Sequence, residues 1–347
     1  MTARWLLAFV PLAIALAWLD VPPSFVCAAA LAAIVPLVGL IGDATEHLAA
    51  RQGPVAGGLL NSTLNNLPEL IIGGVALSNG LSGVVKASLT GAILANLLVS
   101  LGIALLAGGL RHGEQRIDRR RLSVSASMLM ICAFCFIVPA VFTLGAPEGT
   151  RGLSVEMSVV LLGMYVVNLA VTLFAAGNDT GLLAAEQHDD GAKARSSWRS
   201  LGVLAVAAVV LAMVSDALSA ALVPTARSLG LSDTFSGIVF LGGIGSLGEI
   251  LASLRFARQG KPSLVLSSTV GSTIQIVLLV APLLVFAGIL LGQPMDLAFT
   301  SFEVVAIVLA TVITRELIQD GRANWFEGCL LLGVYVILAI GFFHLPD

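Results

Sequence analysis

The chain has 347 residues, of which 57% are hydrophobic and only 11% are charged. Soluble domains carry about 25% charged residues, so this composition excludes a water-soluble globular protein and predicts an all-α polytopic membrane protein. The net charge of −3 says little by itself, whereas the positions of the charges along the chain are informative. We expect the lipid bilayer as a partner and no nucleic acid.

Hydropathy and helix breakers predict eleven transmembrane helices of about 20 residues each, the length that a bilayer of about 30 Å requires. Their ranges are 5–19, 24–50, 56–80, 84–109, 122–144, 153–176, 200–224, 231–256, 262–290, 297–316 and 323–344. The first is short and follows Arg4, as in a cleaved signal peptide. No small-residue cleavage site precedes Pro22, so we expect a retained helix.

The basic residues orient this stack of helices. Of the 18 Lys and Arg residues, 15 fall on one side, and only Lys86, Arg151 and Arg227 fall on the other. The positive-inside rule therefore predicts a cytoplasmic N-terminus and a C-terminus outside. Only three residues precede the first span and no long tail follows the last, which favours the inner (plasma) membrane of a prokaryote.

The apolar stretch 57–80 contains one carboxylate, Glu69, and no Lys or Arg to neutralise it. An ionisable side chain in a membrane-length segment costs about 2.5–3.5 kcal/mol or more, and such a residue indicates a functional site. A single helix would place polar side chains beside it. These are Asn61, Asn65 and Asn66. Pro68 has no N–H, so the carbonyl of Leu64 lacks its helical partner and is available to a ligand.

A second stretch, 237–260, carries Glu249 in a similar setting, at an offset of 249 − 69 = 180 residues. Five helices separate the two copies, and an odd number inserts them in opposite orientations, as in the inverted repeats of secondary transporters. The predicted units are an N-terminal helix (1–22), a first five-helix repeat (23–176), a cytoplasmic acidic linker (177–199) and a second five-helix repeat (200–347). Inverted symmetry brings the two glutamates together near the midplane of the bilayer.

Further polar or flexible residues accompany the second glutamate and the following helices. Gly245 and Ser246 precede Glu249, while Asn96 and Gln275 lie in the next helix of each half, where they either line the site or bond between helices. A third group, at the cytoplasmic end of the second helix, is a candidate gate or proton path. It consists of Asp43, Glu46 and His47. The linker is either a solvated connection or, through residues 186–190, an acidic regulatory element.

Five stretches of the chain carry a resemblance to a known family. They are GDATEHLA at 42–49, GGLLNSTLNNLPELI at 57–71, SLTGAILANLL at 88–98, LSDTFSGI at 231–238 and SSTVGSTIQIVLLVAPLLV at 267–285. The chain resembles the calcium/proton antiporters, or cation/proton exchangers, of the cation/calcium exchanger superfamily. The family's Gly-Asn-Ala-x-Glu signature reads Asn-Asn-Leu-Pro-Glu at 65–69 and Gly-Ser-Leu-Gly-Glu at 245–249. Ser246 thus replaces the asparagine, which bears on the choice of cation.

The paired glutamates predict the mechanism of exchange. Two carboxylates in a low-dielectric site cannot both ionise cheaply, so the empty site holds protons, which a divalent cation displaces. Ca²⁺ prefers about six to eight hard oxygen ligands. The expected ligands are Glu69 and Glu249 with Asn65, Asn66, Ser246 and the carbonyls of Leu64 and Gly245. Ca²⁺ and H⁺ are the expected substrates, with no prosthetic group.

Several alternatives remain open from the sequence. Within the same superfamily, the chain could exchange other ions, as Na⁺/Ca²⁺, Mn²⁺/H⁺ or K⁺/H⁺ exchangers do. An intramembrane hydrolase could use two carboxylates as acid and base, although catalysis needs no inverted repeat. A passive channel is weaker still, because a selectivity filter usually takes rings of ligands from several subunits. Whether the chain forms a homo-oligomer stays undetermined.

Overall fold

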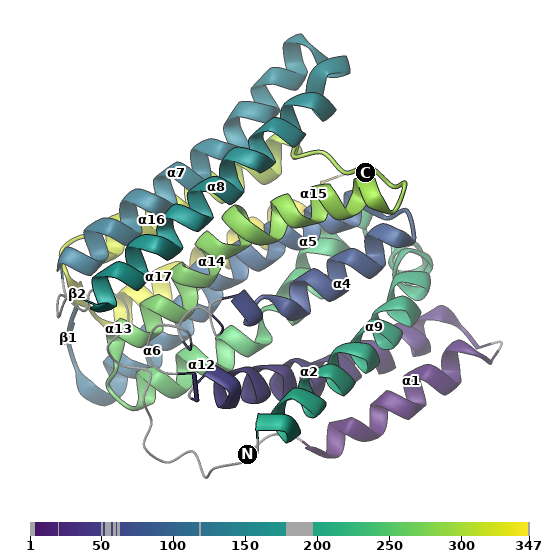
Figure 1. The fold of residues 1–347 in the computed structure, drawn as a ribbon, viewed down its shortest axis with the longest axis horizontal. Coiled ribbons are helices and arrows are strands. Elements are labelled where there is room, and N and C mark those ends of the chain that lie inside the picture. The colour runs from purple at the N-terminus through teal and green to yellow at the C-terminus, as the bar shows by residue number, and fades with distance from the viewer. Residues whose placement is uncertain are drawn as a thin grey trace.

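A computed structural model describes residues 4–19, 21–49, 51–52, 57, 60, 63–117, 119–177 and 197–345. These residues are almost entirely helical (Figure 1). Within them, seven helices are long and apolar enough to cross a membrane, or eight when one bent pair counts as a single span. The predicted fold class, an all-α polytopic membrane protein, is therefore confirmed.

The first part of the chain, up to residue 177, is a succession of helices with one short strand. Its elements are η1 (Arg4–Ala8), α1 (Phe9–Ala17), α2 (Pro23–Ala49), α4 (Leu67–Ser78), α5 (Ser82–Leu94), η2 (Ala95–Ser100), α6 (Leu101–His112), β1 (Gln115–Arg116), α7 (Arg119–Gly145), η3 (Pro147–Gly149) and α8 (Thr150–Gly177). Two of the short elements, η1 and η3, are 3₁₀ helices, whereas η2 is a π-helical turn that continues α5 into α6.

The second part, from residue 197, is also a succession of helices with one short strand, and its helices have more interruptions. Its elements are α9 (Ser197–Ser228), α10 (Asp233–Ser236), η4 (Gly237–Gly242), α11 (Gly243–Gly245), α12 (Leu247–Arg258), α13 (Pro262–Leu266), η5 (Ser267–Gly271), α14 (Ser272–Gln275), η6 (Ile276–Val280), α15 (Ala281–Leu290), α16 (Ser301–Ile318), β2 (Arg322–Ala323) and α17 (Trp325–Phe343). Here η4, η5 and η6 are π-helical. Such turns are rare in helices and occur often at functional sites.

The helices form a central group with a flanking group on each side (Figure 1). Helices α4, α5, α6 and α12 to α15 are central, α1, α2 and α9 lie on one flank, and α7, α8, α16 and α17 lie on the other. The most apolar windows of the central spans Ser82–His112 and Pro262–Leu290 are 72% and 67% buried, against 22% for Trp325–Phe343. The central spans are therefore shielded from lipid and can carry polar groups.

The boundaries of elements in the two parts of the chain match at the offset that aligns the glutamates. α4 and α12 correspond at both ends, since 247 − 67 and 258 − 78 both equal 180. The turns that follow them contain Gly80 and Gly260, whose φ angles of 77° and 68° favour glycine. Packing is reciprocal as well: α4 contacts α9 and α15, whereas α12 contacts α2 and α6.

Both glutamate-bearing stretches are broken helices, and the prediction of one continuous helix over 56–80 is wrong. The backbone leaves helical geometry at Asn66 (φ −92°, ψ 13°) and at Ser246 (φ −80°, ψ 6°). In the second stretch the axis bends by 49° there. Pro68, at the second position of α4, has no N–H to donate to the preceding turn. The polar face expected from a continuous helix is therefore interrupted between Leu64 and Leu67.

Helix α5 and the π-helical η4 touch through their backbones. A Cβ atom added at Gly242 would lie 2.6 Å from the Cα of Gly91 and 2.6 Å from the carbonyl oxygen of Ser88. One added at Gly237 would lie 2.6 Å from the Cβ of Ala87. Only glycine permits this approach. The contact fixes η4, and with it the break at Ser246, against the first part of the chain.

Candidate functional site

Glu69 and Glu249 occupy equivalent positions in the two parts of the chain. Each is the third residue of a helix that begins at a backbone break, in α4 and α12 respectively. The first turn of a helix presents free N–H groups and a partial positive charge, which favour a carboxylate. Each glutamate is only 8% exposed although its helix lies in an apolar part of the chain. The local fold thus holds two carboxylates inside the protein.

The structure brings these two carboxylates together, as the sequence predicted. Gly245, which precedes the second break, lies beside Glu69: a Cβ atom placed on Gly245 would be 3.9 Å from Glu69 Oε1. The carboxyl groups of Glu69 and Glu249 are close enough for their charges to interact. The Oε2 atoms of both are buried without a hydrogen-bond partner among the described residues. Such oxygens are costly to bury and are ready acceptors for a cation.

A hydrogen bond from Asn66 joins the first break to the second half. The side-chain Nδ2 of Asn66, which is fully buried, donates to Oε1 of Gln275 over 2.6 Å. Gln275 is the last residue of α14, immediately before the π-helical η6. This bond attaches the break that precedes Glu69 to α14. Gln275 therefore bonds between helices, and its role in lining the site remains a prediction.

The other described residues predicted as ligands at the breaks are buried or half-buried. Ser246 is fully buried, and its hydroxyl donates to the carbonyl of Gly242 over 3.1 Å. Leu64 and Asn65 are half-buried at the end of the segment that precedes α4, and Gly245 is buried. Their role as ligands of a cation remains a prediction. Asn61 lies outside the described residues.

Asn96 lies in the π-helical turn η2 and is fully buried. Neither its Oδ1 nor its Nδ2 has a hydrogen-bond partner among the described residues. Because a π-helical turn widens the helix, backbone and side-chain groups there are displaced from the regular ladder. An amide that is buried in this way needs a partner that the protein itself does not supply, such as a water or an ion.

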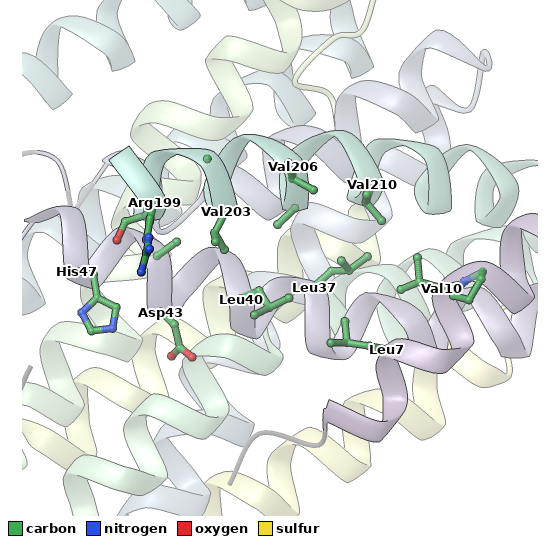
Figure 2. Close-up of a pocket in the computed structure, with 15 residues that line it drawn as sticks. Leu7, Val10, Leu37, Leu40, Asp43, His47, Arg199, Val203, Val206 and Val210 are labelled. Atoms are coloured by element: carbon green, nitrogen blue, oxygen red, sulfur yellow. The ribbon is translucent and has the colours of Figure 1, made fainter. Parts of the chain in front are cut away.

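The three residues Asp43, Glu46 and His47 do not join the glutamates. They lie in the last two turns of α2, where Asp43 and Glu46 are exposed and His47 is half-buried. Glu46 forms an ion pair of 3.9 Å with Arg255 at the end of α12. Asp43 and His47 line a separate cavity between α1, α2 and α9 (Figure 2). A gate or proton path through them remains a prediction.

One contact to the region of the first break was not predicted from the sequence. The hydroxyl of Tyr165 on α8 lies 3.1 Å from Oγ1 of Thr63, three residues before Asn66. Tyr165 is 7% exposed and is one of only two tyrosines in the chain. A buried tyrosine usually places its hydroxyl against a polar partner. A tyrosine in the middle of an apolar span could therefore have predicted a polar contact with another helix.

Glu303 illustrates a buried carboxylate whose acceptors are occupied. It is 2% exposed, at the start of α16, where it forms a capping box with Thr300. Its Oε1 also accepts a hydrogen bond of 3.1 Å from Thr90 of α5. These bonds satisfy the carboxylate and attach α16 to α5. Glu303 is therefore a structural residue, unlike the two glutamates at the breaks.

The donor set around Glu69 and Glu249 consists of hard oxygen atoms. Among the described residues, no group of three or more His, Cys, Asp and Glu side chains could hold a metal ion. A transition-metal site built from nitrogen and sulfur ligands is thus not found in this part of the chain. Two carboxylates with amide, hydroxyl and carbonyl oxygens suit a hard divalent cation such as Ca²⁺.

This arrangement of broken membrane helices around paired carboxylates is typical of a secondary transporter. A model of the family described as "Sodium/calcium exchanger protein" matches residues 23–174 and 199–343. The Ca(2+)/H(+) antiporter of Aphanothece halophytica is 37% identical, over 98% of this chain and 96% of its own. The Ca(2+)/H(+) antiporter ChaA of Bacillus subtilis is 35% identical, over 97% of each.

A solved structure agrees with these sequence matches. The structure of native YfkE superposes with a TM-score of 0.85 at 33% identity and covers 98% of both chains. The chain belongs to the sodium/calcium exchanger family. The resemblance stated from the sequence is confirmed, and so is the prediction of a transporter rather than an enzyme.

Proposed function

We propose that this protein exchanges Ca²⁺ for protons across a membrane, through one site that Glu69 and Glu249 share. One observation carries the proposal: two buried carboxylates from separate halves meet at two helix breaks, each with an oxygen that no described residue satisfies. Relatives named Ca(2+)/H(+) antiporters, which match nearly the whole chain, support the same exchange.

The cation binds between the two breaks. Glu69 and Glu249 supply the charge that balances a divalent ion, while neutral oxygens complete its shell. The neutral ligands that we propose are the side chains of Asn65, Asn66 and Ser246 and the carbonyls of Leu64 and Gly245. Asn96, Gln275 and Asn61 line the site without a direct bond to the ion. Waters supply the remaining ligands, as is common for Ca²⁺.

Exchange follows from the cost of an empty site. Two neighbouring carboxylates away from water stay charged only when a cation is present, and otherwise they take up protons. The helices move between inward-open and outward-open forms when the site holds either Ca²⁺ or protons. An empty, doubly charged site cannot make this transition cheaply, because its charges would lack both water and a counter-ion. Coupling between the two ions therefore needs no second site.

We propose that α2 to α8 and α9 to α17 are two inverted repeats of five spans that follow one N-terminal span, eleven in all. The matched boundaries and reciprocal packing of α4 and α12 support this plan. Contacts such as Glu46–Arg255 and Glu114–Arg322 join residues that the positive-inside rule assigns to the cytoplasm. We assign the chain to a bacterial plasma membrane, with the N-terminus inside and the C-terminus outside, which its bacterial relatives support.

The test is cation uptake by proteoliposomes under an imposed pH gradient in sodium-free medium. We expect Ca²⁺ uptake that stops when the gradient is collapsed. Mn²⁺, Mg²⁺, Na⁺ and K⁺ are compared with Ca²⁺ at equal concentration. We expect no uptake of Mg²⁺, because this ion dehydrates reluctantly. Uptake that requires a sodium gradient instead would overturn the proton coupling. Uptake of Mn²⁺ or K⁺ in preference to Ca²⁺ would overturn the choice of cation while leaving the site in place.

A further inference from the structure

A cavity lies between α1, α2 and α9 (Figure 2). These helices are on the flank opposite α7 and α8 (Figure 1). The cavity volume is about 880 Å³, within the ~300–1,000 Å³ range of pockets that hold small molecules. It runs along α9 from Arg199 to Val210, about 16 Å at the rise of an α-helix. It does not include Glu69 or Glu249.

The wall of this cavity is apolar over most of its length. Side chains from all three helices contribute to it. They include Leu7, Val10, Leu37, Leu40, Val203 and Val206. Two helices, α1 and α2, belong to the first part of the chain and α9 to the second. A hydrocarbon chain is the ligand that suits such a wall, and a bilayer supplies hydrocarbon chains at high concentration.

The polar groups of the cavity gather at one end. Figure 2 shows Arg199 reaching from α9 toward α2, where Asp43 and His47 lie one turn apart. Within the described part of the chain, no ion pair joins Arg199 to Asp43, and neither residue is held by any other partner. The end of the cavity therefore presents one cation and one anion that do not neutralise each other.

The residues around this polar end are of the kinds that collect at a membrane interface. Trp198, next to Arg199, is 81% exposed, and exposed tryptophans collect at membrane interfaces. Glu46, one turn from Asp43, bonds to Arg255 at the end of α12, among the basic residues of the predicted cytoplasmic side. A ligand whose chain occupies the apolar wall would thus place its polar head between Arg199 and Asp43.

We propose that this cavity binds a zwitterionic phospholipid with a primary ammonium group, of the phosphatidylethanolamine type. Its phosphate accepts hydrogen bonds from the guanidinium of Arg199, a geometry that arginine favours, and from His47. Its ammonium donates to the carboxylate of Asp43. An acyl chain follows the wall from Leu40 toward Val10. A choline head has no N–H to donate, and a glycerol head has no positive charge for Asp43.

The test measures lipid retained by the purified full-length protein in native mass spectrometry. Phosphatidylethanolamine, phosphatidylglycerol and phosphatidylcholine with identical acyl chains are compared in separate additions. We expect phosphatidylethanolamine to be retained at least about tenfold better than phosphatidylcholine. Arg199→Gln should lower its retention by about tenfold or more, the loss expected of a charged hydrogen bond. Asp43→Asn should remove the preference over phosphatidylglycerol.

Matched variants separate this site from general lipid affinity. Arg258→Gln and Glu46→Gln change an exposed arginine and an exposed carboxylate outside the cavity, and they should retain wild-type amounts. Val206→Trp fills the apolar wall while Arg199 and Asp43 stay intact, and it should also lose the lipid. Equal retention of the three lipids, or wild-type retention by Arg199→Gln or Val206→Trp, would overturn the proposal. Because retention is measured without transport, this result is independent of the proposed exchange.

Discussion

Glu69 and Glu249 differ from the other buried carboxylate, Glu303, in what satisfies them. Glu303 accepts bonds from Thr90 and Thr300, whereas the Oε2 atoms of Glu69 and Glu249 accept none from the described residues. Burial of an unpaired charge costs several kcal/mol, roughly 3–5 when one partner of a buried pair is missing. The proposed shared site removes this cost, because the two glutamates would then hold a proton or a cation at every stage.

Replacing either glutamate by glutamine should abolish Ca²⁺ transport. Glutamine keeps the volume and imitates the protonated acid, so we expect Glu69→Gln and Glu249→Gln to fold and to be at least as stable as wild type without Ca²⁺. Ca²⁺ at 100 times its Kd should stabilise wild type by about 2.7 kcal/mol and stabilise either variant far less. Thermal unfolding with and without Ca²⁺, together with proteoliposome flux, measures both effects.

The matched control for these variants is Glu156→Gln, which changes an exposed glutamate on α8. It should transport Ca²⁺ and respond to it as wild type does. Glu303 would not serve, since its loss also breaks the capping box of α16. Near wild-type exchange by Glu69→Gln or Glu249→Gln would refute the shared site.

Protons and Ca²⁺ compete for the same oxygens, so acid on the cation-binding side should weaken Ca²⁺ binding. The ligands must lose their protons before the ion binds. The apparent KM for Ca²⁺ should rise as pH falls, by up to about tenfold per pH unit for each proton displaced. Initial rates in proteoliposomes at fixed internal pH and varied external pH give this dependence. A KM that stays constant from acid to neutral pH would show that the transported protons do not bind to the carboxylates that bind Ca²⁺.

At the scale of elements, the two halves are joined where α5 and η4 touch. Gly242 of η4 lies against the backbone atoms of Gly91 and Ser88, and a Cβ atom added at Gly91 of α5 would meet the backbone carbonyl of Ile238 even more closely. Backbone atoms cannot move aside as a flexible side chain can. The position of the second break therefore depends on a contact that has no room for a methyl group.

Gly242→Ala should destabilise the protein, whereas Gly243→Ala should not. A methyl group at Gly242 would lie 2.6 Å from two backbone atoms, and such overpacking costs about 1–3 kcal/mol. A Cβ atom at Gly243 meets nothing within 4 Å, and alanine is about 1 kcal/mol better than glycine within a helix. Unfolding in detergent measures both variants. Equal free energies of unfolding for the two variants would show that α5 and η4 can move apart to accept a methyl group, and that their contact does not stabilise the protein.

The sequence predicted helices and carboxylates well because both leave a local signal. Hydropathy marks a span wherever about 20 apolar residues occur, and Glu69 stands out in such a span because nothing nearby neutralises it. The sequence did not predict the breaks at Asn66 and Ser246, because hydropathy continues through both of them; Pro68 indicated only that the carbonyl of Leu64 lacks its helical partner. The bond between Asn66 and Gln275 could not be predicted, since the two residues are 209 positions apart and meet only in the folded protein.

At the scale of the whole molecule, charged contacts divide into two sets at opposite ends of the bundle. One set contains the pairs Glu46–Arg255 and Glu114–Arg322, and the short strands β1 and β2 pair in the same region. The other contains the Lys86–Asp296 pair at 2.9 Å and the Arg227–Asp233 pair at 3.8 Å. Lys86 and Arg227 are two of the three basic residues predicted outside, and the sidedness itself remains a prediction.

Reporters of membrane sidedness should confirm this orientation. A reporter joined after Asp347 should be active only outside the cytoplasm, and one inserted near Gln187 should be active only in the cytoplasm. The second position belongs to the predicted linker 177–199, most of which lies outside the described residues. The reverse result at either position would invert the proposed topology.

If the two halves are inverted repeats, as we propose, the reciprocal packing of α4 and α12 would let each half take over the contacts of the other. The inward-open and outward-open forms would then contain nearly the same contacts between helices, with the first half in the place of the second and the second in the place of the first. Their free energies differ only through residues that the halves do not share, such as Asn66 against Ser246 and Pro68 against Gly248. These differences between the halves would then decide which form is favoured at rest, whereas the gradients of the two ions set the direction of exchange.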